Sequence, residues 1–197
     1  MRFSTVCVYA GSAPGVQEAY AEAARALAAG LARRGAGVVY GGGSLGLMGE
    51  LADAALDAGA EVVGVIPRFL GDREVGHDGL TDLRVTENMH DRKMLMAEQA
   101  DAFVVLPGGI GTLEEVVEML SWSQLGLHRK PIGLLDTGGF WGPLLDLLDH
   151  MTAEGFVGLD HRRLLLSDPD PEALLDAMEA WEAPAVGRQW LRRPEET

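Results

Sequence analysis

The chain has 197 residues, of which 30 are acidic and 16 are basic, and its formal net charge is −14 at pH 7. Such an acidic excess argues against non-specific binding to nucleic acid or to an anionic membrane, because both need a basic surface. No apolar run approaches the ~18 residues of a membrane span and the N-terminus has no signal-peptide pattern, so we expect a cytoplasmic protein.

Short apolar runs alternate with amphipathic stretches along most of the chain. The stretches place apolar residues three or four positions apart, which indicates strands alternating with helices. The expected strands are residues 3–10, 38–40, 61–66, 83–86, 102–106 and 131–135. The expected helices are approximately residues 16–31, 46–58, 90–99, 112–125, 140–152 and 171–181, with a charged loop over 68–79.

Strands that are apolar throughout and alternate with helices are typical of a parallel sheet covered on both faces. We therefore predict a doubly wound, mostly parallel α/β sheet of the Rossmann-like kind, with helices on both faces. It would form a single domain over residues 1–182, followed by a loosely held C-terminal tail over residues 183–197. Ligands of such folds bind beyond the carboxyl ends of the strands, where three glycine-rich segments fall in this sequence.

The glycine-rich segment from Gly41 to Gly46 has the G-x-G-x-x-G spacing of dinucleotide-binding proteins. It follows the second expected strand instead of the first, and no acidic residue stands about 20 residues later at a strand end, which disfavours an NAD or FAD site. The glycines would still let backbone N–H groups approach a phosphate at a helix N-terminus. The alternative is a tight turn that binds nothing. We expect no cofactor.

The segment PGGIGTLEE, from Pro107 to Glu115, is the stronger phosphate candidate. It joins an apolar strand to a helix that carries a threonine in its first turn. Thr112 and Glu115 also have the T-x-x-E spacing of a capping box, in which the glutamate would fold back on the start of its own helix. A cap requires neither the preceding glycines nor two adjacent glutamates, so a functional Glu115 is favoured.

Arg92 and Lys93 form a cation pair in a chain whose only other lysine is Lys130. They begin the helix before the strand that leads to Pro107, so a parallel sheet brings both motifs to one edge. Paired cations beside backbone amides suit a phosphomonoester. The alternative is a solvated helix start, although cations there oppose the helix dipole.

A metal site is not expected. The five histidines show neither H-x-H nor H-x-x-x-H spacing, and Cys7 is the single cysteine. Cys7 lies within the first expected strand, where a small core residue is more typical than a nucleophile.

The sequence MHDRK at residues 89–93, followed by P-G-G-x-G-T-x-x-E at residues 107–115, resembles the Lonely guy (LOG) family. Members of this family are cytokinin riboside 5′-monophosphate phosphoribohydrolases, often labelled lysine decarboxylases. The resemblance extends over about residues 6–175. It implies hydrolysis of the N-glycosidic bond of an adenosine monophosphate, often prenylated, to the free base and ribose 5-phosphate. It also implies a homodimer with active sites near the interface.

The resemblance implies that Arg92 and Glu115 are the catalytic pair. The substrate-binding residues that it implies are Gly11, Ser12, Gly43, Ser44, Glu74, Lys93, Gly108, Gly109, Ile110, Gly111, Thr112, Leu113, Glu114 and Ser121. Ala10 and Ile110 replace a frequent Cys and a frequent Tyr of the family, which bears on the fit of the substrate.

Two other functions stay open. A carrier of a nucleotide or phosphorylated cofactor would share the fold but would not need the pair of Arg92 and Glu115. A pyridoxal-phosphate decarboxylase would need Lys93 or Lys130 as its Schiff-base lysine.

Overall fold

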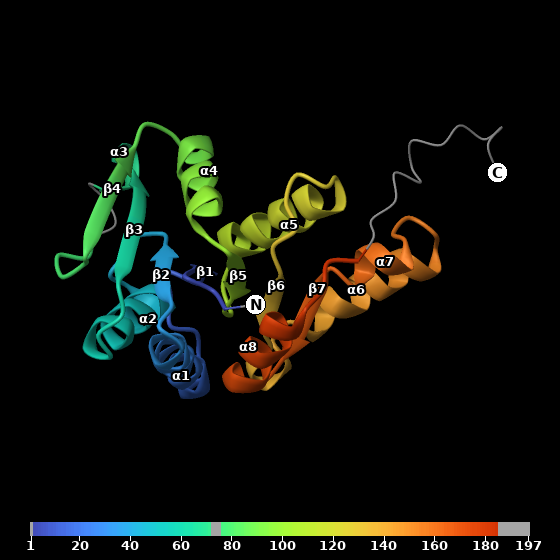
Figure 1. The fold of residues 1–197 in the computed structure, drawn as a ribbon, viewed down its shortest axis with the longest axis horizontal. Coiled ribbons are helices and arrows are strands. Elements are labelled where there is room, and N and C mark those ends of the chain that lie inside the picture. Colours follow the sequence, from blue (N-terminus) through green and yellow to red (C-terminus); the bar gives the residue numbers. More distant parts are fainter. Residues whose placement is uncertain (1, 72–75, 185–197) are drawn as a thin grey trace.

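One parallel sheet of seven strands organises the computed structural model, which describes residues 2–71 and 76–184 (Figure 1). The strands are β1 (Thr5–Tyr9), β2 (Gly37–Tyr40), β3 (Val62–Pro67), β4 (Asp82–Thr86), β5 (Ala102–Val105), β6 (Ile132–Leu135) and β7 (Leu165–Asp168). Their order is β4-β3-β2-β1-β5-β6-β7, and every neighbouring pair is parallel. The predicted doubly wound α/β fold is therefore confirmed.

Helices cover both faces of this sheet. They are α1 (Glu18–Arg34), α2 (Gly46–Asp57), α3 (Arg68–Gly71), α4 (Met89–Gln99), α5 (Ile110–Gln124), the 3₁₀ helix η1 (Thr137–Gly139), α6 (Gly142–Ala153), α7 (Leu159–Arg162) and α8 (Pro171–Ala180). In Figure 1, α1, α2 and α8 lie below the sheet, and α4 and α5 lie above it. Within the described ranges, no helix is long and apolar enough to cross a membrane.

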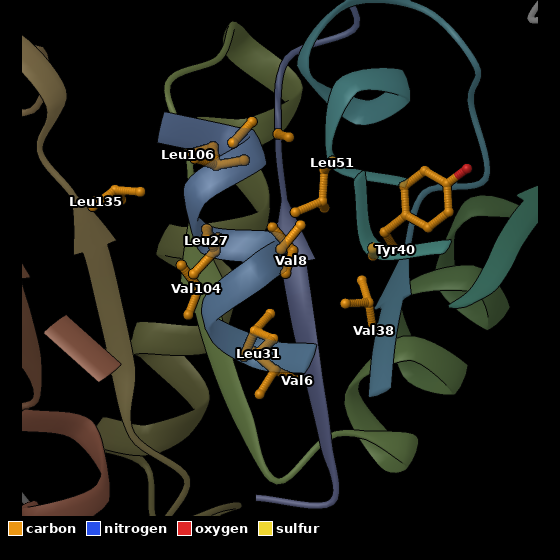
Figure 2. Packing of buried hydrophobic residues seen from close by; sticks show 14 of the residues in the cluster. Val6, Val8, Leu27, Leu31, Val38, Tyr40, Leu51, Val104, Leu106 and Leu135 are labelled. Carbon is orange, nitrogen blue, oxygen red and sulfur yellow. The ribbon is translucent and has the colours of Figure 1, made fainter. Parts of the chain in front are cut away.

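The central strands bury both of their faces, which explains why their sequences are apolar without interruption. Val6 and Val8 of β1 pack under α1 in one core with its Leu27 and Leu31 (Figure 2). Cys7 and Tyr9, which point to the opposite face, belong to a second core beneath α4 and α5. Cys7 is completely buried, so its prediction as a core residue is confirmed.

Over residues 2–71 and 76–184, the structure contains four elements that were not predicted, namely β7, α3, η1 and α7. The strand β7 was not predicted, because only its first two residues, Leu165 and Leu166, are apolar and Ser167 is exposed at the edge of the sheet. One helical turn, α3, opens the segment 68–79 that was expected to be a loop. Of the expected tail, residues 185–197 lie outside the described residues.

The order of the strands reverses between β1 and β5. From β1 the chain moves outward through β2, β3 and β4, and it then returns to place β5 on the other side of β1. The loops that leave these two strands diverge toward opposite faces, which opens a crevice at the carboxyl edge of the sheet. The N–H of Gly11 donates to the carbonyl of Pro107 at 3.1 Å and ties the two loops together at their base.

Candidate active site

A cavity of about 210 Å³ lies at the point where the strand order reverses. Its walls are the loop after β1 and the loop after β5, together with side chains from the starts of α1 and α2 and from the end of η1. The lining residues are Gly11, Ser12, Ala13, Pro14, Gly15, Tyr20, Leu47, Pro107, Gly108, Gly109 and Phe140. Two of the three predicted glycine-rich segments therefore meet at one cavity.

The 107–112 loop contains glycines of two kinds. A Cβ atom on Gly108 would lie 2.2 Å from the Oγ1 atom of Thr112, so packing alone requires a glycine there. A Cβ atom on Gly109 or Gly111 would meet nothing within 4 Å, and neither residue has a positive φ angle. Neither packing nor backbone conformation explains these two glycines. They leave open space beside the first turn of α5, where backbone N–H groups without helical partners can receive an anion.

Glu115 does not form the capping box that its spacing from Thr112 allows. The helix α5 already begins at Ile110, so Thr112 lies inside its first turn, and Gly109 occupies the N-cap position. The Glu115 carboxylate instead accepts a hydrogen bond from Arg92 of α4, with 2.9 Å between Nη1 and Oε1. The side chains of Arg92 and Glu115 are only 12% and 10% exposed.

Two further contacts fix the Arg92 side chain. Its Nε donates to the backbone carbonyl of Val65 in β3 at 3.0 Å, and its Nη1 lies 3.4 Å from the sulfur of Met89. A Cβ atom on Gly41 would stand 2.2 Å from Nη2, so the glycine after β2 leaves room for the guanidinium. Asn88 accepts a hydrogen bond from the backbone N–H of Asp91 and caps α4 one turn before Arg92.

Burial and charge act in opposite directions on Glu115. Burial raises the pKa of its carboxyl to about 7, although the positive charge of Arg92 opposes the rise. The neighbouring Glu114 raises the pKa further, and Lys93 lowers it. A carboxyl group that titrates near neutral pH inside a cleft is suited to exchange protons with a substrate or with water.

Two other residues of the predicted site belong to an ion cluster on α4 and α5. The Nζ atom of Lys93 lies 2.5 Å from Oε1 of Glu114 and 2.9 Å from Oε2 of Glu118. The Lys93 side chain is only 5% exposed, whereas that of Glu114 is about half exposed. The structure thus joins the predicted Lys93 and Glu114 to each other, one residue away from Arg92 and Glu115.

The remaining predicted residues are spread more widely. Gly43 accepts a hydrogen bond from the Tyr40 hydroxyl through its carbonyl, and the half-buried Ser44 leads into α2. Ile110, the first residue of α5, is 82% exposed, and Leu113 packs into the core beneath α5. Glu74 lies outside the described residues.

Ser121 does not lie at the cavity between the loops after β1 and β5. It lies nearly two turns beyond Glu115 on α5 and lines a separate cavity of about 150 Å³ with residues such as Val117, Leu148 and Met151.

Sequence reasoning did not assign Gly41, Tyr20 or Phe140 to the site. Gly41 belongs to a glycine run that the sequence displays, but only the position of Arg92 shows which glycine must stay small. Phe140 follows Gly138 and Gly139 at the end of another strand, and this glycine pair was the available signal. The Val65 carbonyl that anchors Arg92 is a backbone group and leaves no sequence signal.

In the part of the chain that the structure describes, no group of three or more His, Cys, Asp or Glu side chains could hold a metal ion.

Comparisons with known proteins identify the family of this chain. Residues 48–178 match a family model described as "possible lysine decarboxylase". The chain is 47% identical over 180 residues to the cytokinin riboside 5′-monophosphate phosphoribohydrolase LOG of Oryza sativa subsp. japonica, covering 91% of this chain and 74% of the rice protein. It is 44% identical over 180 residues to the cytokinin riboside 5′-monophosphate phosphoribohydrolase LOG2 of Arabidopsis thaliana, covering 91% of this chain and 84% of that protein.

Solved structures with lower sequence identity share the fold. The molybdenum cofactor carrier protein of Chlamydomonas reinhardtii is 22% identical with a TM-score of 0.67, over 89% of this chain and 96% of the carrier. The molybdenum cofactor binding protein of Rippkaea orientalis is 20% identical with a TM-score of 0.67, over 91% of this chain and 98% of that protein. The matched family model and the identity to the plant enzymes agree with the two motifs at residues 89–93 and 107–115, and the chain therefore belongs to the LOG family.

Proposed function

We propose that the protein hydrolyses the N-glycosidic bond of adenosine 5′-monophosphate, either unmodified or prenylated on its exocyclic amine. The products are adenine or a cytokinin base, together with ribose 5-phosphate. The observation that carries the proposal is the buried pair of Arg92 and Glu115, 2.9 Å apart, next to an open helix N-terminus. The activity named for the rice and Arabidopsis relatives supports it.

The phosphate group is assigned to the 107–112 loop. The first N–H groups of α5 and the open space beside Gly109 and Gly111 suit an anion. Binding energy from the phosphate then holds the ribose in place, although the phosphate takes no part in the reaction.

We assign Glu115 to act at C1′, the ribose carbon at which the bond to the base breaks. Cleavage of an N-riboside develops positive charge on the ribose, as glycoside hydrolysis does, and a nearby carboxylate stabilises that charge. As the bond from C1′ to the base nitrogen breaks, its electron pair leaves with the base. The oxygen of water bonds to C1′, and a proton passes from the water through Glu115 to the departing base. Arg92 holds the ionised carboxylate in place between turnovers.

The residues do not fit the pyridoxal phosphate that a lysine decarboxylase would use. A Schiff base needs an unprotonated lysine amine with free access to the cofactor. Lys93 is held between two carboxylates, which more than offset the effect of burial and keep its pKa above the usual value. Burial lowers the pKa of Lys130, but its Nζ donates to the carbonyl of Ala97 at 2.6 Å, at the opposite end of α4 from Arg92 and so away from the site.

The test is chromatography after incubation with AMP and, separately, with isopentenyl-AMP. We expect a free base and ribose 5-phosphate from the wild type, and a rate at least about 100-fold lower from Glu115→Gln, the scale for loss of a general base. Glu22→Gln is the matched control, because Glu22 is exposed on α1. Nucleotide binding without release of base from either compound would contradict the proposal and indicate a carrier.

We also propose that the protein is a homodimer. Exposed apolar side chains, including Met94, Val117 and Leu127, lie on α4, on α5 and on the loop after α5. Met94 and Leu127 border an apolar cavity of about 280 Å³ that a second copy could fill. Sedimentation should give a species of twice 21.0 kDa, and Val117→Asp should shift it to the monomer. A wild type that sediments only at 21.0 kDa would refute the dimer.

A further inference from the structure

Lys93 occupies an unusual position for a residue expected to bind phosphate. Its ammonium group is almost fully buried and already contacts two carboxylates, Glu114 at 2.5 Å and Glu118 at 2.9 Å. A lysine, a glutamate and a second glutamate together carry a net negative charge. A phosphate that approached Lys93 would therefore meet repulsion from the half-exposed Glu114.

The contacts of Lys93 run parallel to those of Arg92. Arg92 and Lys93 are adjacent on α4, and their partners Glu115 and Glu114 are adjacent on α5. The second partner of Lys93, Glu118, stands one helical turn after Glu114. A single cation that bridges two successive turns resists both the sliding and the rotation of α5 along α4.

Arg92 and Glu115 depend on this register. Arg92 is anchored to β3 through its Nε contact with the Val65 carbonyl, so it cannot follow a movement of α5. Among the described residues, the Glu115 side chain has Arg92 as its only hydrogen-bond and ion-pair partner, and apart from that contact α5 sets its position. A small shift of α5 would therefore separate the two groups.

We propose that Lys93 is a positioning residue, which bridges Glu114 and Glu118 and so holds α5 in register with α4, keeping the Glu115 carboxylate on Arg92. The kinetic part of this inference rests on the proposed hydrolase function. The structural part does not, because the state of Glu115 can be measured without turnover.

The charged and titratable groups around Glu115 define what that measurement reports. Arg92 and Lys93 approach from α4, Glu114 precedes it on α5, and Tyr9 and Cys7 lie beneath it on β1. Burial raises the pKa of the Tyr9 hydroxyl and of the Cys7 thiol well above their usual values, so both stay neutral at working pH. Loss of Arg92 or Lys93 from its place therefore raises the pKa of Glu115.

The experiment compares the wild type with Lys93→Met, Lys93→Arg, Glu118→Gln and the double variant Lys93→Met/Glu118→Gln. Steady-state cleavage of AMP gives kcat and KM. Carbon-13 NMR of labelled glutamate gives the titration of Glu115 without substrate, and its signal is identified by its absence in Glu115→Gln. Circular dichroism reports whether each variant folds.

For Lys93→Met we expect kcat to fall about tenfold with KM within about twofold of the wild type, because misplacement of a reacting group slows chemistry more than binding. Glu115 should titrate at higher pH in this variant. Lys93→Arg keeps the positive charge and a side chain long enough to reach both carboxylates, so it should restore kcat and the Glu115 titration. Glu118→Gln should lower kcat less, and should add nothing in the Lys93→Met background, because both changes break one bridge.

A different pattern would overturn the proposal. If Lys93 binds the nucleotide directly, Lys93→Met raises KM about tenfold and leaves kcat unchanged. If Lys93→Met does not fold, the proposal fails when Glu118→Gln leaves kcat unaltered. If the wild type cleaves neither AMP nor isopentenyl-AMP, the proposed function fails, while an unshifted Glu115 signal in Lys93→Met would separately refute the role of Lys93.

Discussion

At the scale of single residues, Glu115 combines two opposing influences in one group. Burial makes its ionised form unfavourable, and the contact with Arg92 at 2.9 Å makes it favourable, with burial the stronger of the two. A carboxyl whose pKa is higher in the folded chain than in the unfolded chain holds its proton more tightly when folded. Ionised Glu115 therefore reduces stability at the pH where the proposed reaction needs it.

The raised pKa of Glu115 predicts how folding stability depends on pH. Between pH 4.5 and about 7 the unfolded state has lost the Glu115 proton and the folded state has kept it, so folding stability falls as pH rises through this range. At about 1.4 kcal/mol for each unit of pKa, the loss is about 3 kcal/mol by pH 8. Urea unfolding of the wild type and of Glu115→Gln at pH 4 and pH 8 checks this prediction. From pH 4 to pH 8, the free energy of unfolding of the wild type should fall by this amount relative to that of the variant. A constant difference at the two pH values would contradict the raised pKa.

Gly111 tests whether the open space beside the 107–112 loop belongs to a ligand. Among the described residues, nothing outside its own helix turn lies within 4 Å of a Cβ atom there, so Gly111→Ala should leave the fold intact and stabilise it by up to about 1 kcal/mol. The same methyl group would stand where we place the phosphate, so KM for AMP should rise about tenfold or more.

Gly142→Ala is the matched control for this change. Gly142 also lies in the first turn of a helix, α6, with nothing within 4 Å of an added Cβ, but far along the chain from the 107–112 loop. Thermal melts and AMP kinetics of both variants separate the two roles. An unchanged KM in Gly111→Ala would show that the phosphate does not bind beside Gly111.

At the scale of elements, the site depends on contacts between segments that the chain separates. The loop after β2 approaches α4 so closely that Gly41 has no room for a side chain beside Arg92 and Met48. The guanidinium cannot simply move aside, because it is held by Val65 and by Glu115. We expect Gly41→Ala to displace Arg92 and to lower kcat by a factor similar to that of Arg92→Ala.

A double-mutant cycle checks this prediction. If Gly41 acts through Arg92, the Gly41→Ala change should have little further effect on kcat in an Arg92→Ala background. Independent effects that multiply in the double variant would mean that Gly41 contributes in another way.

The elements that could be predicted from sequence are those whose burial leaves a simple pattern. β1 and β5 are covered on both faces and are therefore apolar throughout, whereas β7 at the sheet edge shows only three leucines before polar residues. Parallel pairing then explains why the glycine-rich segments were correctly expected at one edge of the sheet.

The pairing of side chains was less predictable. Thr112 and Glu115 fit both a local cap and a contact with another helix, and only the position of α4 decides between them. The bridge from Lys93 to Glu118 depends on the register of two helices, which no local pattern encodes. The position of Ser121, away from the cavity, could not be predicted for the same reason. The resemblance identifies the residue but does not say on which face of α5 it lies.

At the scale of the whole molecule, charge is the dominant feature. The excess of acidic over basic side chains gives −14 at pH 7, and like charges repel in the compact state. Salt screens this repulsion, and the screening length falls from about 30 Å at 0.01 M to about 8 Å at 0.15 M ionic strength. The melting temperature at pH 8 should therefore rise by several degrees when sodium chloride is increased over that range.

The effect of salt should depend on pH in a definite way. Near pH 4.6, the isoelectric point of the sequence, carboxylate protonation removes the net charge and with it the repulsion that salt can screen. The same increase in sodium chloride should then leave the melting temperature unchanged or lower it slightly, because ion pairs such as Arg34–Glu172 are weakened as well. An equal rise in melting temperature at both pH values would indicate that salt stabilises the protein by binding to it or by exclusion from its surface, and not by screening its net charge.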